Sequence, residues 1–316
     1  MFPMLQATEK IWMNGAFVKW DDAKVHVLTH SLHYSTAVFE GIRCYKANDG
    51  PAVFRLHEHV DRLFDSAHIL QMQIPFAREA VAEAILETIR ENKIDACYIR
   101  PLAYIGYGAM GVFPKDNPVD LAIAVWPWGS YLGEEGIKNG IRVKISSFVR
   151  PHVNATMVRS KTAANYANSL LAKREALKDG YDEAILLDTD GYVAEGSGEN
   201  IFIVRKGLIK TPPLTSILEG ITRDTIIHLA AERGMRLVEE RFTRDELYIA
   251  DEAFFTGTAA EITPIREVDN RQIGKGKPGR VTAELQAAFF DIVNGRHNRH
   301  EDWLTFVYAK QPAVKK

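Results

Sequence analysis

The order of strand-like and helix-like segments constrains the fold of this chain most strongly. Asn-Gly at 14–15 and Asn-Asp-Gly at 48–50 each separate two apolar runs, which predicts two β-hairpins near the start. Two helices with apolar residues at helical spacing and then two further strands follow, at residues 57–72, 78–92, 96–108 and 119–128. Because strands and helices mix without strict alternation and no internal repeat occurs, we predict an α+β fold rather than a doubly wound sheet.

A glycine-rich segment divides the chain into two predicted domains. Residues 129–140 read GSYLGEEGIKNG and combine four glycines with several charges, as interdomain linkers do. We therefore predict a small N-terminal domain over 1–128, a linker over 129–139 and a larger C-terminal domain over 140–316. The larger domain should hold a strand, a helix, several short strands and further helices, followed by a polar tail after Gly295.

The composition favours a small-molecule partner. The 316 residues are 46% hydrophobic, enough for a substantial core, and 39 basic side chains nearly balance 41 acidic ones. This balance argues against a protein that binds nucleic acid or a membrane surface. Cys44 and Cys97 form no Cys-x-x-Cys pair, and neither a signal peptide nor a membrane span is visible, so we predict a cytoplasmic protein.

Lys161 is the strongest candidate for a reactive group. A single lysine is usually a solvated surface residue. This one lies in the segment SKTAANY, where alanines leave room around it and Tyr166 follows five positions later. A lysine shielded from water loses part of its proton affinity and can form a Schiff base with a carbonyl compound. Pyridoxal phosphate is the commonest partner for that chemistry.

A bound pyridoxal phosphate also requires an acid at its ring nitrogen and an anion site for its phosphate. Glu195 ends a predicted strand just before a glycine-rich turn, although a solvated turn acid would look the same. The amides of Ile221 and Thr222 begin a predicted helix, and Thr258 lies in a small-residue turn after a strand, so both places can bind an anion. Each feature is weak alone, because helix ends and tight turns are common.

Taken together, these segments resemble the fold-type IV pyridoxal-phosphate enzymes, and among them the branched-chain amino acid aminotransferases. Seven motifs occur in the family's order along nearly the whole chain: HYSTAVFEGIR, YIRP, PWGSYLG, SKTAANY, EGSGENIF, GITRD and GTAAEITP. The resemblance implies a D-amino acid aminotransferase-like architecture, in which the cofactor lies between a small α+β N-terminal domain and a larger C-terminal domain.

The same resemblance implies the roles of the residues around pyridoxal 5'-phosphate. Lys161 matches the lysine that carries the cofactor as a Schiff base and moves the proton during transamination. Glu195 matches the acid beside the pyridine nitrogen, and Tyr166 matches the tyrosine that bonds the ring hydroxyl. The residues that match the family's phosphate site are Arg62, Ile221, Thr222 and Thr258.

The family transfers the amino group of L-leucine, L-isoleucine or L-valine to 2-oxoglutarate in a ping-pong reaction. Arg100 matches the group for the side-chain carboxylate of glutamate, and Tyr98 would hold the α-carboxylate with the amides of Thr258 and Ala259. The residues that match the apolar wall are Tyr34, Phe39, Trp128, Tyr131 and Tyr166. Met110 and Val112 match the loop that closes the pocket of the neighbouring subunit, which implies a homodimer or a higher homo-oligomer.

Two positions depart from the family pattern. Ser35 stands where the family often has glycine, and Glu219 precedes GITRD where an uncharged residue is more usual. An acid close to a phosphate would repel it, so we expect the Glu219 side chain to point to solvent.

Three other interpretations differ in substrate or in class. D-amino acid transaminases and aminodeoxychorismate lyases share the lysine, the acid and the phosphate motifs, whereas YIRP, PWGSYLG and GTAAEITP as a set favour the branched-chain enzyme. A non-catalytic binding module would have no use for a lysine and a ring acid together. A metal site is disfavoured by the loose spacing of the candidate ligands, which are His26, His30, His33, His57 and His59.

Overall fold

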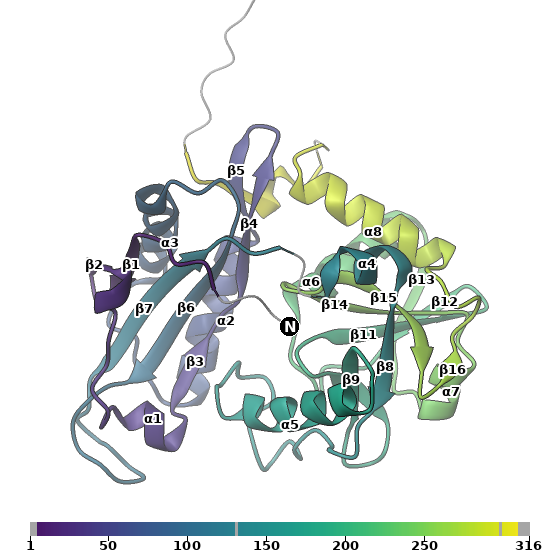
Figure 1. Cartoon of the computed structure of the whole chain (residues 1–316), viewed down its shortest axis with the longest axis horizontal. Helices are drawn as coiled ribbons and strands as arrows, with labels where there is room; N and C mark the ends of the chain where they lie inside the picture. The colour runs from purple at the N-terminus through teal and green to yellow at the C-terminus, as the bar shows by residue number, and fades with distance from the viewer. Residues whose placement is uncertain (1–4, 130–131, 297–298, 309–316) are drawn as a thin grey trace, which may run out of the picture. The chain divides into compact units, whose positions relative to one another are not determined.

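The computed structural model describes residues 5–129, 132–296 and 299–308, which form two compact units (Figure 1). Of these residues, unit 1 comprises those within 5–128, 160–163 and 290–308, and unit 2 comprises those within 129–159 and 164–289. This division follows Trp128, but it differs from the predicted continuous domains because two later segments belong to unit 1.

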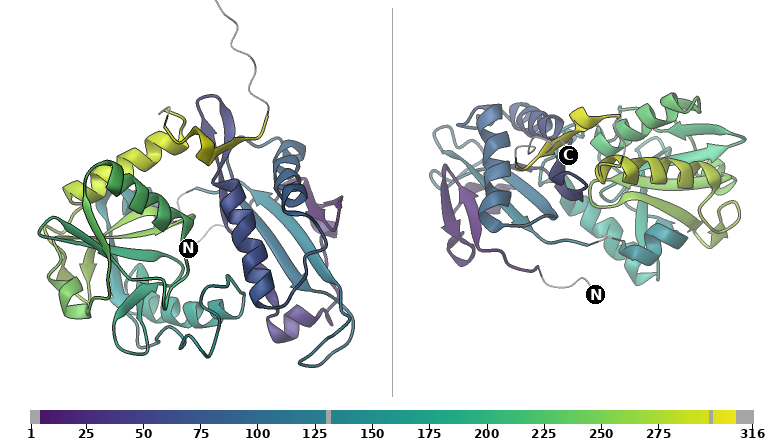
Figure 2. Two further views of the ribbon diagram at one scale, coloured as in Figure 1. Left: turned by 180° about the vertical axis from the view of Figure 1, so that it is seen from behind. Right: turned by 90° about the horizontal axis from the view of Figure 1, so that it is seen from above.

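Unit 1 is an antiparallel sheet with helices on one face. Its elements are β1 (Lys10–Met13), β2 (Ala16–Lys19), η1 (Trp20–Asp22), α1 (His30–Tyr34), β3 (Ala37–Phe39), β4 (Ile42–Ala47), β5 (Gly50–Phe54), α2 (Leu56–Ile69), α3 (Arg78–Asn92), β6 (Cys97–Ile105), β7 (Val119–Trp126), η2 (Glu301–Trp303) and β17 (Leu304–Phe306). The strands follow the order β17-β5-β4-β6-β7-β1-β2, and β3 also pairs with β6. Figure 2 shows α2 and α3 against the same face of this sheet.

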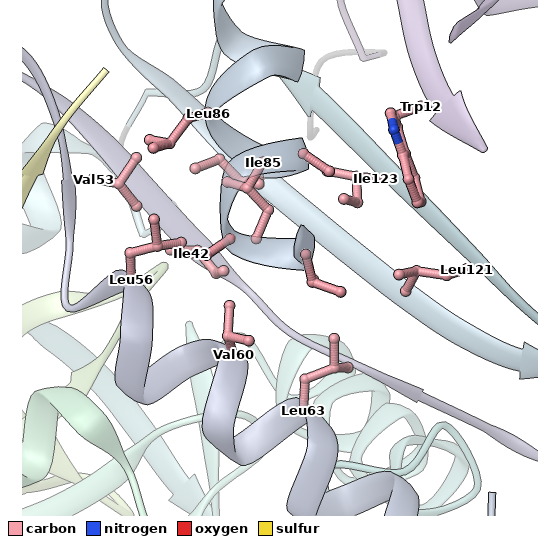
Figure 3. Packing of buried hydrophobic residues seen from close by; sticks show 14 of the residues in the cluster. Trp12, Ile42, Val53, Leu56, Val60, Leu63, Ile85, Leu86, Leu121 and Ile123 are labelled. Carbon is pink, nitrogen blue, oxygen red and sulfur yellow. The ribbon is translucent and has the colours of Figure 1, made fainter. Parts of the chain in front are cut away.

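The apolar core of unit 1 lies between these two helices and the sheet. Figure 3 shows Ile42, Val60, Leu63, Ile85 and other apolar side chains from β4, α2, α3 and β7 pointing toward one another, and these four are almost fully buried. Because apolar residues recur at helical spacing along α2 and α3, each helix presents one apolar stripe to the strands. The two consecutive helices were therefore readable from the sequence, and α3 has the predicted bounds.

Both predicted hairpins are present in unit 1. Asn14 and Gly15 join β1 to β2 with φ angles of 48° and 95°, the left-handed conformation that a two-residue hairpin turn requires. The second hairpin joins β4 to β5, and its register pairs Ala47 with Gly50.

The residues after Gly295 are not the simple polar tail that we expected. Strand β17 pairs antiparallel with β5, and the side chains of Trp303 and Val307 are buried. The expectation was wrong for 303–307 because so short an apolar stretch, lying between polar residues, gives almost no periodic signal.

Unit 2 is a strand-rich unit built around a closed ring of strands. Its elements are α4 (Gly133–Asn139), β8 (Ile141–Ile145), α5 (Asn165–Lys178), β9 (Glu183–Leu187), β10 (Val193–Gly196), β11 (Asn200–Arg205), β12 (Leu208–Thr211), α6 (Ile221–Glu232), β13 (Arg236–Glu239), α7 (Arg244–Tyr248), β14 (Glu252–Gly257), β15 (Glu261–Val268), β16 (Arg271–Gln272) and α8 (Arg280–Val293), whose last residues belong to unit 1. Strands pair in the order β10-β9-β8-β15-β14-β11, and β10 also pairs with β11. That last pairing closes the ring, and it joins Glu195 to Asn200.

The segment predicted as a linker contains a helix. Residues 133–139 form α4, which packs along β15, and Gln286 donates a hydrogen bond to the Ile137 carbonyl. A Cβ atom at Gly136 would lie 2.9 Å from the Ile141 side chain, so this glycine lets the helix approach β8 closely. Gly136, one of the glycines that suggested a linker, therefore allows a helix to pack closely against a strand.

None of the helices within the described residues is both long enough and apolar enough to cross a membrane.

Candidate active site

Lys161 belongs to unit 1, where its backbone is fixed on both sides. Its N–H donates to Ser66 Oγ at 2.9 Å, and its carbonyl accepts the Phe39 N–H at 3.1 Å. The next residue, Thr162, donates its hydroxyl to the Ala37 carbonyl at 3.1 Å. The half-buried side chain places Nζ 5.3 Å from the centre of the Phe39 ring. Bonds to α2 and β3 thus hold the lysine in one position.

Arg62 lies in a buried charge cluster on the same unit. Its Nε and Nη2 atoms donate to the two oxygens of Glu40 at 2.7 and 2.9 Å, and Nδ1 of His59 lies 2.8 Å from the same carboxylate. The Glu40 side chain has no exposed surface, and that of Arg62 is 12% exposed. The carboxylate therefore fixes the plane of the guanidinium, as a bidentate pair does.

The protonation states within this cluster follow from its contacts. Burial opposes ionisation of Glu40, but the charge of Arg62 and the hydrogen bonds from His59 and Arg62 hold its pKa well below the ordinary range. Burial lowers the pKa of His59, and the charges of Arg62 and Lys161 lower it further, against the opposing effect of Glu40. A neutral His59 therefore donates its Nδ1 proton to an ionised carboxylate.

An aromatic surface with one arginine lies on the strands beside this cluster. The Tyr98 ring is 4.4 Å from the Trp128 ring, and the Arg100 guanidinium lies 4.7 Å from the Phe39 ring and 5.4 Å from the Tyr98 ring. Among the described residues, Nε of Arg100 is buried without a hydrogen-bond partner. A buried donor of this kind is costly unless a ligand supplies the acceptor.

Gly41 permits the observed position of Tyr98. A Cβ atom at Gly41 would lie 2.0 Å from the Tyr98 hydroxyl oxygen and 2.9 Å from Cζ, so any other residue would displace the phenol ring. The glycine in the motif HYSTAVFEGIR is thus explained by a close contact with the motif YIRP.

Tyr34 and Ser35 end the short helix α1. The Tyr34 ring stacks on the buried His30 ring at 4.5 Å, and its own side chain is 41% exposed. Ser35 has φ 55° and ψ 28°, the left-handed conformation in which glycine is favoured. This backbone requirement explains why glycine is the more usual residue at the position.

Met110 and Val112 lie on an exposed loop of unit 1. Their side chains are 44% and 90% exposed, and the loop is anchored by Nε2 of His30, 2.7 Å from the Gly111 carbonyl. The remaining candidate for the apolar wall, Tyr131, lies outside the described residues.

Glu195 is fixed from three sides in unit 2. Nε of Arg150 lies 3.0 Å from Oε1, while Nδ2 of Asn200 and the Leu218 N–H donate to Oε2 at 3.1 and 3.3 Å. The Glu195 side chain is only 8% exposed. Because its charge is balanced by Arg150, the carboxylate is suited to receive a hydrogen bond from a protonated ring nitrogen.

Asn200 connects this acid to the start of α6. Its amide also donates to the Leu218 carbonyl at 2.9 Å, two residues before Gly220, which is the N-cap of the helix. A Cβ atom at Gly220 would lie 1.9 Å from Asn200 Oδ1, so glycine is required here. The helix begins with the amides of Ile221 and Thr222, and no side chain caps it. Such an end offers N–H donors to an anion.

The other site candidates of unit 2 lie in turns and at helix ends. Thr258 and Ala259 form the turn between β14 and β15, at the same end of the strands as Glu195, since Asn200 pairs with both Glu195 and Thr256. Tyr166 is the second residue of α5 and is half-buried. The Glu219 carboxylate is 52% exposed and pairs with Arg159, so it points to solvent as expected.

The structure thus gathers the predicted residues into two groups, one on each unit. Unit 1 carries Lys161, Arg62, Phe39, Tyr98, Arg100 and Trp128 on neighbouring elements, and unit 2 carries Glu195, Ile221, Thr222, Thr258, Ala259 and Tyr166. The sequence reasoning missed the side chains that orient them, which are Glu40, His59, Arg150 and Asn200. Two of these, Glu40 and Asn200, stand within motifs that the resemblance used, but nothing in one sequence shows that they face an arginine or an acid.

Three of the five histidines that were weighed as metal ligands contact other groups. His30 contacts Thr36 and the Gly111 carbonyl, His33 contacts the Val27 carbonyl, and His59 bonds Glu40. Within the described ranges, no group of three or more His, Cys, Asp or Glu side chains has an arrangement that could hold a metal ion.

Comparisons with known proteins identify one family over most of the chain. The family described as Amino-transferase class IV matches residues 37–268. The branched-chain-amino-acid aminotransferase of Pseudomonas aeruginosa is 56% identical over 297 residues, covering 94% of this chain and 97% of that protein.

Solved structures give the same result. The crystal structure of the Escherichia coli branched-chain amino acid aminotransferase superimposes with a TM-score of 0.94 at 47% identity, covering 95% of this chain and 100% of that one. The branched-chain amino acid aminotransferase of T.th., complexed with N-(5'-phosphopyridoxyl)-L-glutamate, has a TM-score of 0.92 at 50% identity and covers 96% of this chain and 100% of that chain. Both alignments extend over nearly all of the elements that carry the two groups of residues.

Proposed function

Since this chain belongs to the class IV aminotransferases and, among them, to the branched-chain-amino-acid aminotransferases, we propose that it transfers the amino group of L-leucine, L-isoleucine or L-valine to 2-oxoglutarate. The reaction would be ping-pong, with pyridoxal 5'-phosphate as the cofactor. The single observation that carries the proposal is the position of Lys161. Hydrogen bonds fix its backbone on the same unit that contains the buried cluster of Arg62, Glu40 and His59.

The described side chains fit this cofactor. Arg62 is oriented by Glu40 for a phosphate, and the uncapped start of α6 at Ile221 and Thr222 offers amides to the same kind of anion. The Glu195 carboxylate, paired with Arg150, is the candidate partner of a ring nitrogen, and Tyr166 is the candidate donor to a ring hydroxyl. When bound, pyridoxal phosphate supplies an aldehyde and a ring that accepts the electrons released at Cα of the amino acid.

Lys161 and Glu195 would act on two different protons, one at Cα of the amino acid and one at the ring nitrogen of the cofactor. Lys161 Nζ is the proposed attachment point for the cofactor. Once the amino acid has displaced it, the free amine would move the proton from Cα of the amino acid to C4′ of the cofactor, and the second half-reaction would reverse this transfer. Glu195 would accept a hydrogen bond from the protonated ring nitrogen, because Arg150 and Asn200 fix the orientation of its carboxylate.

The substrate pocket would combine apolar and polar contacts. Phe39, Trp128 and Tyr166, with Tyr34 and Tyr131, are the proposed contacts for the aliphatic side chains. Arg100 is the proposed partner of the second carboxylate of glutamate, and its buried Nε without a partner among the described residues supports this assignment. Tyr98 and the amides of Thr258 and Ala259 would bind the α-carboxylate.

The exposed loop supports a homo-oligomer. Val112 and Phe113 are 90% and 79% exposed, and Met110 lies two positions before Val112. Exposed apolar side chains in one loop are typical of an interaction surface, and we propose that a second copy of this chain covers them. A cytoplasmic location, based on cysteine usage, stays a prediction.

A D-amino acid transaminase or an aminodeoxychorismate lyase remains the alternative with the same fold. The names of the curated relatives favour the branched-chain enzyme.

Replacing the lysine tests the proposal. Lys161→Ala should bind pyridoxal phosphate poorly or only noncovalently and lose transamination, whereas the exposed Lys178→Ala should behave as the wild type. The assays are covalent retention of the cofactor after borohydride reduction and formation of glutamate from L-leucine and 2-oxoglutarate. Near-normal turnover of Lys161→Ala contradicts the proposal.

A further inference from the structure

A second buried acid lies four residues from Glu195. Glu199 directly precedes β11 and is 5% exposed, and its Oε2 atom accepts the Gly198 N–H at 3.0 Å. Neither the proposed chemistry nor the anion sites described above use this side chain. Its presence beside Glu195 requires an explanation, because a buried carboxylate is costly unless it is paired or neutral.

Two buried cations of unit 2 are engaged by carboxylates other than Glu199. Arg150 pairs with Glu195 at 3.0 Å, and Lys173 pairs with Glu183 at 2.5 Å and also donates to the Asp182 carbonyl at 2.7 Å. Among the residues that the structure describes, no lysine, arginine or histidine lies within ion-pair distance of Glu199. Three buried acids thus share two buried bases, and Glu199 is the acid without a cation.

The Glu199 side chain also fills a space that two glycines create. A Cβ atom at Gly196 would lie 2.6 Å from Glu199 Oε2, and one at Gly257 would lie 3.6 Å from Glu199 Cγ. Gly196 ends β10, directly after Glu195, and Gly257 ends β14, directly before Thr258. The Glu199 side chain therefore packs between the end of β10, which carries Glu195, and the turn proposed to bind the α-carboxylate.

We propose that Glu199 is a positioning residue that acts as a neutral carboxylic acid, holding the end of β10 and the turn at Thr258 together without placing a second negative charge beside Glu195. The inference rests on the proposed function, since it assigns Glu195 and the turn at Thr258 their roles toward cofactor and substrate. A neutral acid can accept the Gly198 N–H, and it carries no charge that requires a cation.

The surrounding charges agree with this geometry. Burial and the charge of Glu183 on β9 raise the pKa of Glu199 to about 8, with a smaller contribution from Glu195 on β10. Lys173 on α5 and the Gly198 N–H act in the opposite direction. On the next strands, the buried Glu261 of β15 lies opposite Gly257 of β14 and adds no cation.

This assignment gives the pH dependence a definite sign. The unfolded chain loses the Glu199 proton near the ordinary value of 4.5, whereas the folded chain keeps it until about pH 8. The folded state therefore binds more protons within this window, and its stability should fall as the pH rises through it. The contribution is complete below pH 4.5 and lost above pH 8.

The test compares Glu199→Gln, which has the shape of the protonated acid, with Glu199→Ala, which removes the group. With the loaded protein at pH 7, the glutamine variant should keep pyridoxal phosphate affinity within about twofold, and the alanine variant should lose about tenfold. The wild type should lose cofactor affinity above pH 8, and this loss should be weaker in Glu199→Gln. The exposed Glu284→Gln should reproduce the wild-type profile throughout.

Urea unfolding of the apoprotein between pH 5 and 9, followed by circular dichroism, gives a readout without cofactor. The midpoint of Glu199→Gln should fall less with pH than that of the wild type. The claim that Glu199 is neutral is wrong if Glu199→Gln loses cofactor affinity as Glu199→Ala does. It is also wrong if the unfolding midpoints of Glu199→Gln and the wild type have the same pH dependence. If Glu199→Ala keeps full affinity, the positioning role is wrong. If the wild type binds no pyridoxal phosphate, the proposed function fails, and the apoprotein data still decide whether Glu199 is neutral.

Discussion

Replacing Glu40 by glutamine should destabilise unit 1 through the arginine that it leaves behind. The wild-type carboxylate is fully buried and receives hydrogen bonds from Nε and Nη2 of Arg62 and a contact from Nδ1 of His59, all at 2.7–2.9 Å. A glutamine keeps the size of the side chain but provides one acceptor oxygen and no charge.

The magnitude follows from burial. Removing one partner of a buried ion pair typically costs about 3–5 kcal/mol, because the other charge remains buried without its counterion. The Arg62 side chain is 12% exposed, and glutamine still accepts one hydrogen bond, so we expect the lower end of that range, about 3 kcal/mol.

The pH dependence of this cost has a definite direction. The contacts lower the pKa of Glu40 in the folded state, so its stabilising contribution is fully present above the unfolded value of 4.5. This stabilising contribution decreases as the pH falls below 4.5, because Glu40 then becomes protonated in the unfolded chain but stays ionised in the folded chain. The difference between wild type and Glu40→Gln should therefore be constant from pH 6 to 8 and shrink between pH 4.5 and 3.

Tryptophan fluorescence is a suitable probe for this experiment. All five tryptophans of the chain, at positions 12, 20, 126, 128 and 303, belong to unit 1, so the signal reports the unit that contains Glu40. Urea unfolding at each pH gives the free energy of unfolding, provided that the slopes of the two proteins agree. The exposed Glu87→Gln on α3 is the matched control and should stay within about 0.5 kcal/mol of the wild type. An equally small effect for Glu40→Gln, or a difference that persists unchanged at pH 3, would refute the reasoning.

Three further substitutions test single contacts. Ser35→Gly should stabilise unit 1 by about 0.5 kcal/mol in urea unfolding, because it relieves a left-handed φ of 55° at some entropic cost, whereas Ser35→Ala should not. Gly41→Ala should displace Tyr98, whose hydroxyl lies 2.0 Å from the new Cβ, and raise KM for L-leucine more than it lowers cofactor affinity; an unchanged KM contradicts the role of Tyr98. Gly220→Ala should weaken pyridoxal phosphate binding, since its Cβ would lie 1.9 Å from Asn200 Oδ1, and equilibrium dialysis that finds wild-type affinity speaks against this contact.

Local sequence signals were sufficient for most of the regular structure. The Asn-Gly pair at 14–15 forces a tight hairpin by its own conformational preferences, and α3 has apolar residues at helical spacing over its whole length. These elements depend on neighbours in the sequence, so one sequence contains the information.

The misjudged segments depend on partners that are distant in the chain. Residues 304–306 form a strand because they pair with the edge of β5, which lies about 250 positions earlier in the chain. Residues 133–139 form a helix despite two glycines because the helix packs against β15 and β8. Lys161 belongs to unit 1 because its backbone pairs with β3. None of these partners is visible in the local pattern.

The candidate site shows the same limit. Lys161, Glu195 and Arg62, the proposed reactive lysine, ring acid and phosphate ligand, could be selected from the motifs that carry them, whereas their supporting residues could not. Glu40 meets Arg62 from a position 22 residues away, and Arg150 meets Glu195 from 45 residues away. A buried charge pair of this kind leaves no trace in composition or periodicity, because only the fold brings its members together.

The visible absorbance of the purified protein, loaded with pyridoxal phosphate, tests the central claim most directly. The spectrum is recorded alone, after L-leucine, after D-alanine in a separate sample, and after 2-oxoglutarate is added to the leucine-treated protein. We predict that L-leucine removes the absorbance of the lysine-bound cofactor, that D-alanine leaves it unchanged, and that 2-oxoglutarate restores it. A protein that shows no such absorbance, or one that responds to D-alanine and not to L-leucine, would contradict the account.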